Sequence, residues 1–448
     1  MQTELKHSKL EKILKLAKNN GASEAEIIQS SWTENPINFE NNKLKTLESN
    51  QSTGISIRLI KNKKIGTSST TDPEALEKVV TTAVEASEFG PIATFELSKE
   101  NLRTQNQKLT NPELPLENLV ERGTAVIEQL KTFHKDLLIS GGFNLGYGET
   151  IYLNSNGVTG KREKSVYSSS LYAHLVRGED FLGIYKGKSS LEDFPDEKEI
   201  SKKIFEKLNF SKENISLETN KYQVFFTPDA TASIFGYILA VIFNGKVIQQ
   251  GISPLVGKLN KELFDKKLTF IEDPGIGVQK ADFDDEGIKT QRKTLIKNGV
   301  INSFYFDLSS GSKLRSQKQD YVTLTSTGNG FKASLSTSPT PELTSVLIEG
   351  GKTDSKDIIK NIKDGIIIDQ VLGAGQSNTL AGEFNVGIDL GFKVKDGNIQ
   401  GRIKNCMIAG NIFEVLKNIQ EISSDREWVG GAELFPGFLI ESLTVAGK

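Results

Sequence analysis

The sequence predicts an α+β fold in three parts: an N-terminal α/β region with a hairpin, a middle α+β region, and a larger β-rich C-terminal domain with a buried central helix. The chain has 448 residues, which is too many for one compact core, so two or three domains are expected. Apolar residues change between helical and strand spacing along the chain. We place the parts at residues 1–95, 116–218 and 221–447, with a polar linker at residues 98–115.

The first region is expected to begin with an amphipathic helix and to continue into a hairpin. Apolar residues recur at helical spacing in residues 10–17, with Ser8 as the N-cap and Gly21 as the stop. Residues 54–60 alternate as a strand does, and a polar turn leads to a second strand at residues 65–69.

Further helices and strands follow the hairpin. Asp72 is the expected N-cap of the next helix, with Pro73 at its first position. The middle region predicts a helix at residues 116–132, then strands rich in Ser, Tyr and Gly around a turn at residues 154–157. A charged helix at residues 197–208 closes this region.

Composition and charge exclude several classes of protein. Lys and Arg number 55 against 57 Asp and Glu, and the pI of about 6.1 disfavours nucleic-acid binding. The first twenty residues lack the apolar core of a signal peptide. The most apolar run, residues 234–243, has about half the length of a membrane span. We therefore expect a cytoplasmic protein with neither nucleic acid nor membrane as partner.

Few residues could hold a transition metal. A catalytic zinc needs three protein ligands, mostly His, Cys and carboxylate, yet the chain has three histidines and one cysteine. No two histidines share a helical face. We expect His7 to be solvated, His134 to end a helix, His174 to occupy one face of a strand and Cys406 to be a buried core thiol.

The acidic segment at residues 282–287 begins like a calcium loop. An EF-hand requires a bidentate Glu at the twelfth position, which is Lys293 here, so that site is excluded. Two interpretations stay open. The segment is either a solvated loop in front of a strand or the rim of a cleft, where Asp284, Glu286 and Arg292 position a substrate backbone or a partner loop.

Two glycine-containing loops only partly match nucleotide-binding motifs. Residues 251–258 have one residue too many for a P-loop, and Leu259 replaces the hydroxyl residue that would hold magnesium, so packing or partner contact is expected. Residues 373–376 lack the third glycine of a dinucleotide fingerprint and predict a tight turn after a buried strand.

Several segments, in the same order along the chain, resemble motifs of the TldD/PmbA family, the two-component peptidases once described as modulators of DNA gyrase. They are the glycine-marked hairpin, the Asn-Ser-x-Gly turn, the Gly-Lys-Leu block and the run from Phe283 to Val300, together with residues 381–384, 408–411 and 438–447. In the TldD-type member a helix carries the zinc motif HExxxH. The matching positions read Gly236, Tyr237 and Val241.

The chain therefore resembles the PmbA (TldE) type, which lacks the metal. The resemblance implies a dimer in which a TldD-type subunit supplies the zinc and unfolded peptides are the substrates. It implies neither catalytic residues nor a cofactor in this chain. Candidate contacts to the substrate or the partner are Ser253, Gly257, Lys258, Asp284, Glu286, Gly287 and Arg292.

Two further expectations accompany this resemblance. The helix at residues 228–243 is apolar on nearly every face, so we expect core to surround it. The absence of metal ligands also fits an alternative function, a non-enzymatic homodimer that binds peptides or proteins.

Overall fold

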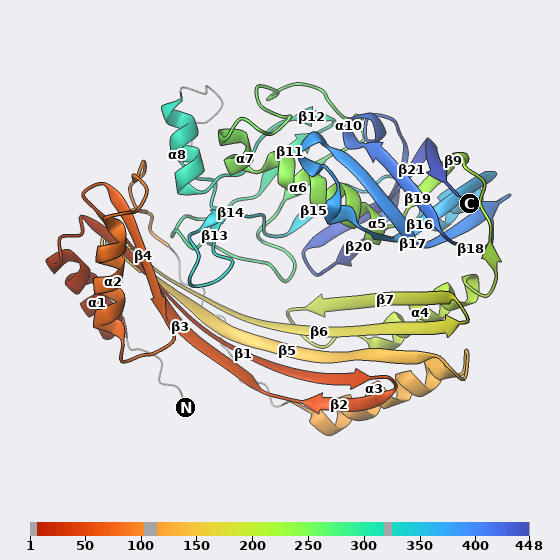
Figure 1. Ribbon diagram of the computed structural model, residues 1–448, viewed down its shortest axis with the longest axis horizontal. Coiled ribbons are helices and arrows are strands. Elements are labelled where there is room, and N and C mark those ends of the chain that lie inside the picture. The colour runs from red at the N-terminus through yellow and green to blue at the C-terminus, as the bar shows by residue number, and fades with distance from the viewer. Residues whose placement is uncertain (1–6, 103–113, 318–324, 448) are drawn as a thin grey trace.

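The computed structural model describes residues 7–102, 114–317 and 325–447 (Figure 1). Two large sheets organise these residues. A curved seven-stranded sheet comes from the first half of the chain, and a twelve-stranded sheet comes from the second half. The second half lies on the concave side of the seven-stranded sheet (Figure 1). The mixed α+β class predicted from the sequence is confirmed.

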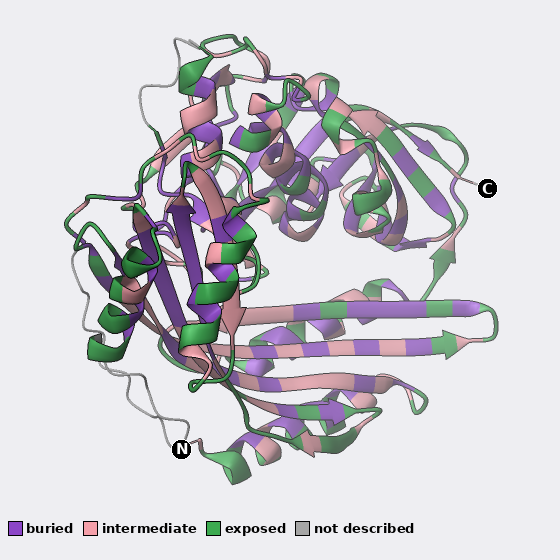
Figure 2. Ribbon diagram, turned by 60° about the vertical axis from the view of Figure 1, so that its left-hand side comes forward, coloured by how far each residue is buried: buried purple, intermediate pink, exposed green. Residues whose placement is uncertain are grey.

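The seven-stranded sheet has the order β4-β3-β1-β5-β6-β7, with β2 paired to β1. Along much of its long strands, buried residues alternate with partly buried ones, as Figure 2 shows. The tight turn between β3 and β4 has Asn62 and Lys63 at positive φ, as a two-residue hairpin requires. The strands are β1 Glu24–Glu40, β2 Lys43–Leu47, β3 Asn50–Lys61, β4 Lys64–Thr70, β5 Leu138–Asn154, β6 Thr159–Arg177 and β7 Asp180–Ser190.

In the described part of this half, four helices pack on the sheet. They are α1 His7–Asn19, α2 Leu76–Ser87, α3 Leu116–Lys131 and α4 Glu197–Phe210. Two expected caps are wrong. Ser8 lies inside α1, and Asp72 accepts the Glu74 N–H at 2.9 Å in a turn before α2 begins. Asp72 and Pro73 begin this turn, and the helix starts at Leu76, three residues after Pro73.

The first two predicted regions share the seven-stranded sheet. β1 pairs with β5 over fourteen registered positions, from Glu26 with Asn154 to Phe39 with Gly141. Residues 1–95 and 116–218 therefore build one sheet together, and the boundary between them stays a prediction. Part of the expected linker, residues 103–113, lies outside the described residues.

The twelve-stranded sheet has β21 near its middle, paired with β9, β15, β19 and β20. A separate pair, β13 Gly330–Phe331 and β14 Thr340–Pro341, lies beside it. The twelve strands are β8 Asn214–Ile215, β9 Asn220–Phe226, β10 Phe270–Glu272, β11 Lys293–Lys297, β12 Val300–Ile301, β15 Val346–Ile348, β16 Asp364–Leu372, β17 Glu383–Lys395, β18 Asn398–Ile403, β19 Cys406–Asn411, β20 Ile419–Val429 and β21 Glu433–Ala446.

Short helices complete the second half. They are α5 Pro228–Thr231, α6 Tyr237–Phe243, α7 Gly245–Gln249, α8 Leu308–Ser316, α9 Ser355–Lys360 and α10 Ile412–Val415. The turn predicted at residues 373–376 is confirmed, with Gly373 at φ +85° after β16. Cys406 is buried in β19, also as predicted.

The expected central helix is present as α5, a π-helical turn at Ala232–Gly236, and α6. Phe235 stacks on Phe438 and meets Phe226 edge-on inside the largest core. The expectation of core on nearly every face is wrong for one side. Tyr237 is 43% exposed, Ser233 is exposed, and residues 240–241 are half-buried. The helix thus has one solvent-accessible face, and Tyr237 and Val241 of the predicted metal-motif positions lie on it.

None of the helices in the described ranges combines the length and the apolar character needed to cross a bilayer.

Candidate functional site

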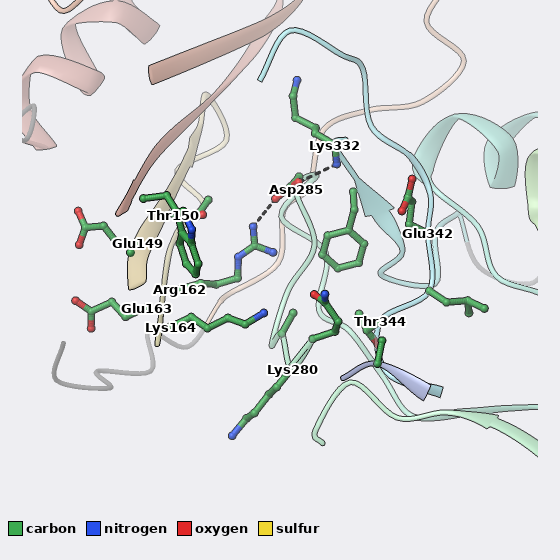
Figure 3. A pocket seen from close by; sticks show the side chains of 17 residues that line it. Glu149, Thr150, Arg162, Glu163, Lys164, Lys280, Asp285, Lys332, Glu342 and Thr344 are labelled. Carbon is green, nitrogen blue, oxygen red and sulfur yellow. Dashed lines mark hydrogen bonds and ion pairs between the residues drawn. The ribbon is translucent and has the colours of Figure 1, made fainter. Parts of the chain in front are cut away.

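A cleft of about 460 Å³ opens between the concave face of the seven-stranded sheet and loops of the second half (Figure 3). The sheet contributes residues of β1, β5 and β6 to its wall. The loops contribute residues before β11 and around β13 and β14. The lining residues are Trp32, Gly148, Glu149, Thr150, Arg162, Glu163, Lys164, Gln279, Lys280, Ala281, Asp285, Phe331, Lys332, Glu342, Leu343, Thr344 and Ala432.

Strand geometry gives the sheet side of the cleft its shape. Arg162 and Lys164 are two residues apart on β6, so both side chains project from the same face. Lys164 pairs in register with Gly148, which pairs in turn with Trp32. A Cβ on Gly148 would lie 2.7 Å from the Trp32 ring. The missing side chain therefore lets the indole lie against β5 beside Lys164.

Arg162 fixes the loop side of the cleft to the sheet. Its guanidinium forms an ion pair with Asp285 and donates a hydrogen bond to the Phe283 carbonyl at 2.8 Å. Asp285 also accepts the Lys332 N–H at 2.9 Å. One carboxylate thus joins β6, the acidic loop and the segment after β13, and it neutralises Arg162.

The remaining charges of the cleft lie in a poorly solvated setting. Burial, and then the nearby Arg162, lowers the pKa of Lys164 to about 8. Burial, and then Arg58, lowers the pKa of Lys332 to about 8, and its ammonium donates to Ser56 Oγ at 3.0 Å. Burial also raises the pKa of Glu342. Lys164 and Lys332 can therefore change protonation near neutral pH, so the net charge of the cleft depends on the ligand bound in it.

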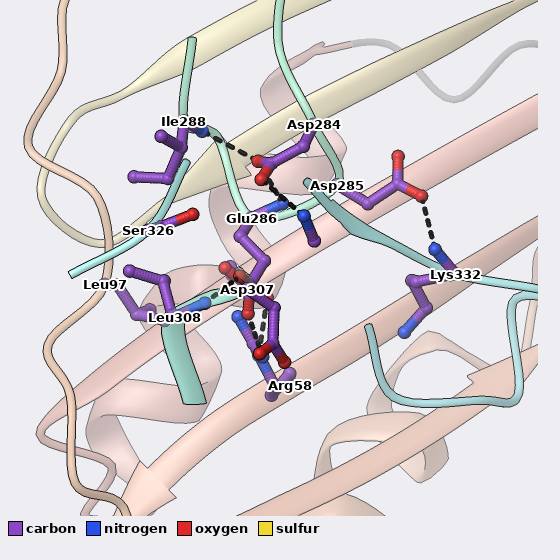
Figure 4. A network of polar contacts seen from close by, with 12 residues as sticks. Arg58, Leu97, Asp284, Asp285, Glu286, Ile288, Asp307, Leu308, Ser326 and Lys332 are labelled. Atoms are coloured by element: carbon purple, nitrogen blue, oxygen red, sulfur yellow. Dashed lines mark hydrogen bonds and ion pairs between the residues drawn. The ribbon is translucent and has the colours of Figure 1, made fainter. Parts of the chain in front are cut away.

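A buried network of charged side chains supports the cleft from behind (Figure 4). Asp284 and Glu286 are both 0% exposed. Asp284 accepts the N–H groups of residues 286, 288 and 330 at 2.8–2.9 Å. Glu286 accepts the Leu308 N–H at 2.6 Å and pairs with Arg58 at 2.8 Å.

The interpretation of this segment as a solvated loop is therefore wrong. Acidic residues are normally exposed, but here donors from distant parts of the chain hold the carboxylates of Asp284 and Glu286 inside the protein. Neither carboxylate faces the cleft. The residue between them, Asp285, is the one whose side chain lines it.

The other candidate residues do not gather around the cleft. Gly287 has φ +69° and packs against the Tyr152 ring behind it. Arg292 is exposed and pairs with Asp273 at 3.1 Å. Ser253 is buried, and its hydroxyl donates to the Ile242 carbonyl at 2.6 Å, close to the end of α6.

Gly257 and Lys258 lie on an exposed loop after Ser253. Gly257 has φ +68°, and no atom lies within 4 Å of the position a Cβ would take. Their expected role in substrate or partner contact stays a prediction.

The metal-motif positions lie at the π-helical turn and in α6. A Cβ on Gly236 would lie 2.5 Å from Phe435 Cε2 and 3.0 Å from Glu433 Oε1. The space that a first histidine would need is thus filled by Phe435. Tyr237 and Val241 offer a phenol and an isopropyl group, which are not zinc ligands. The residues at these three positions do not fit a zinc ion.

Glu433, at the start of β21, was not among the predicted site residues. Burial raises its pKa to about 7. Its neighbour Ala432 lines the cleft. The carboxylate is thus close to both the replaced metal motif and the cleft. No sequence motif identifies Glu433, because its carboxylate comes close to Gly236 only when β21 packs across the helix.

His134 and His174 lie where helix and strand patterns placed them. His134 follows α3, is exposed, and accepts the Asp136 N–H at 3.2 Å. His174 lies on β6, stacked between Tyr172 and Phe181. His7 is the first described residue of α1, and its expected exposure to solvent stays a prediction. Within the described ranges, no three His, Cys, Asp or Glu residues are grouped so as to hold a metal ion.

Arg162, Lys164, Lys332 and Glu342 were also missed from the sequence. The first two could have been found, since alternate cations after the Asn-Ser-Asn-Gly turn lie on one face of a strand. Lys332 and Glu342 carry no local signal because they flank the short pair β13 and β14.

Comparisons with known proteins agree with this architecture. Residues 219–447 match the PmbA/TldA metallopeptidase C-terminal domain, and residues 25–87 match domain 1 of that family. An uncharacterised protein of Methanocaldococcus jannaschii is 24% identical, over 96% of this chain and 99% of that protein. Metalloprotease PmbA of Escherichia coli O157:H7 is 23% identical, over 95% of this chain and 92% of that protein.

The crystal structure of TldE from Thermococcus kodakarensis has the same fold, with a TM-score of 0.88. The two sequences are 23% identical, and the match covers 98% of this chain and 100% of the Thermococcus kodakarensis chain. The family resemblance predicted from the sequence motifs is confirmed, and this chain belongs to the TldD/PmbA family of metallopeptidase-like proteins.

Proposed function

We propose that this chain is the non-metal subunit of a TldD/TldE-type metallopeptidase and that it holds unfolded peptides for a zinc-bearing, TldD-type partner. The observation that supports this proposal best is the packing at Gly236. Phe435 occupies the volume next to its Cα, so a metal-binding side chain has no room there. The helix keeps an open face at Tyr237, although Gly236, Tyr237 and Val241 supply neither imidazole nor carboxylate there.

The chemistry of this chain is then binding and orientation. The cleft combines a flat indole, a phenyl ring and both signs of charge in about 460 Å³, which suits part of an extended peptide with mixed side chains. The zinc-bound water and its general base would belong to the partner. This subunit would restrict which segments reach them.

Cleavage of an unstructured peptide tests the proposal. The chain would be assayed alone, with a TldD-type subunit from the same organism, and with that subunit after its motif glutamate is changed to glutamine. Zinc would be measured in every sample. We expect the chain alone to be inert and free of zinc, and the mixture with the intact partner to exceed that partner alone.

Three results would contradict the proposal. Cleavage by the chain alone would reveal a catalytic site of its own. Activity that persists with the glutamine variant would also place the chemistry in this chain. Peptide binding without any stimulation of the partner would favour the non-enzymatic homodimer.

A further inference from the structure

Lys164 is one of the charged residues of the cleft that form no ion pair within the described part of the chain. Glu149 and Glu163 both pair with Lys161, at 2.8 and 2.7 Å, and Arg162 pairs with Asp285. Among the described residues, none forms an ion pair or a hydrogen bond with the Lys164 ammonium. The cleft therefore presents an ammonium that the protein itself leaves unsatisfied.

The surroundings of Lys164 leave room for a ligand. Its neighbour in register is Gly148, which has no side chain, and β7 ends before it reaches this level of β6. Lys164 lines the main cleft and also a smaller cavity of about 30 Å³ beside Leu191. Figure 3 shows its side chain extending from β6 toward the middle of the lining residues.

Burial makes an unpaired ammonium costly, and a bound anion removes that cost. Glu342 also lines the cleft but does not pair with Lys164. Its carboxylate disfavours a dianion such as phosphate more than a singly charged anion. A singly charged carboxylate matches one free ammonium and can accept hydrogen bonds from it.

We propose that Lys164 binds a carboxylate of the peptide held in this cleft, either the C-terminal carboxylate or that of an Asp or Glu side chain. This inference rests on the proposed peptide-binding function and adds a preference to it. The site would select acidic segments or chain ends of unfolded peptides.

Calorimetric titration with short N-acetylated peptides of Gly, Ser and Ala tests the inference. One peptide ends in a free carboxylate, a second in an amide, and a third in an amide with one internal Glu. We expect at least one of the two carboxylate peptides to bind about tenfold or more tightly than the neutral amide, as hydrogen bonds to a charged group allow. The peptide that shows the preference identifies the source of the carboxylate.

Variants test whether Lys164 causes the preference for a carboxylate. K164Q should abolish the preference, whereas K164R should retain most of it. The control K43Q also removes one positive charge, from an exposed position on β2 of the same sheet, and should leave the preference for the carboxylate peptide unchanged. Thermal melting of each variant checks that it is folded.

Two outcomes would overturn the inference, and they differ in what they say about function. Equal affinity for all three peptides, or a preference that survives K164Q, would reject the role of Lys164 and leave peptide binding intact. No binding of any peptide, to the chain alone or to the complex with a TldD-type partner, would reject the inference and the proposed function together.

Discussion

Arg58 on β3 and Glu286 in the acidic loop lie 228 positions apart in the sequence and form a buried ion pair of 2.8 Å. Arg58 also lies 2.6 Å from Glu26 on β1. Burial alone would lower the pKa of the guanidinium, but the two carboxylates raise it above its ordinary value. This triad fixes the second half of the chain to the concave sheet, directly behind the cleft.

Replacing Glu286 with Gln should lower the free energy of unfolding by about 2–4 kcal/mol at neutral pH, because Arg58 loses half of its compensation in a buried site. Urea denaturation measures the change. The control is E96Q, since Glu96 pairs with Lys99 on the surface and both side chains are exposed; its transition should coincide with that of the unchanged protein. An unaltered transition for E286Q would mean that Glu286 carries a proton in the folded protein.

Gly287→Ala should destabilise the protein by about 2 kcal/mol or more, since strain from positive φ adds to a clash. A Cβ there would lie 2.4 Å from the Tyr152 ring. The Tyr152 hydroxyl is held by Glu26 at 2.9 Å, which prevents easy movement of the ring. Gly157 has φ +83° with no atom near its Cβ position, so G157A reports the backbone strain alone, about 1 kcal/mol. Equal losses in both variants would show that Tyr152 adapts.

Restoring the motif residues should not restore the metal. A variant with G236H, Y237E and V241H is expected to contain no stoichiometric zinc by mass spectrometry, because Phe435 fills the space beside position 236. The single change G236H should cost about 1–3 kcal/mol of stability through overpacking. Y237E alone serves as the control, since Tyr237 is on the open face. One zinc per chain in the triple variant would show that the core adapts and that only the ligands were missing.

Glu433 should make stability depend on pH. Its pKa rises from 4.5 to about 7 in the folded protein because burial disfavours the charged form. The folded state therefore retains the proton longer than the unfolded state does. This contribution is complete below pH 4.5 and is lost as the pH rises through about 7.

The test compares E433Q with the unchanged protein in urea at several pH values. The two should be nearly equal near pH 5, and E433Q should be more stable by about 1–2 kcal/mol at pH 8. E441Q is the control, because Glu441 is exposed on the same strand. A difference that does not vary with pH would show that Glu433 is ionised in the folded protein throughout this range.

Local elements were predictable because their signals lie within a few residues. The hairpin of β3 and β4, the turn between β5 and β6, and helices α3 and α4 follow from spacing and turn residues. The family was predictable as well, because its motifs recur in order along the chain. These features depend on neighbours in sequence, so the sequence contains them directly.

Burial of charge was not predictable in the same way. Asp284 and Glu286 belong to residue types that are normally solvated, and their donors at Gly330 and Arg58 are remote in sequence. The cleft was missed for a related reason. Lys164 and Glu342 lie on separate elements, and only the closure of the second half over the curved sheet places both in its wall.

The sequence by itself determined the local elements, the family and the loss of imidazole and carboxylate at Gly236, Tyr237 and Val241. The tertiary structure alone decided which charges are buried, that Lys164 faces the cleft without a partner among the described residues, and where Phe435 packs. The physical reason is that local backbone preferences are encoded by adjacent residues, whereas desolvation depends on chain segments that meet only after folding.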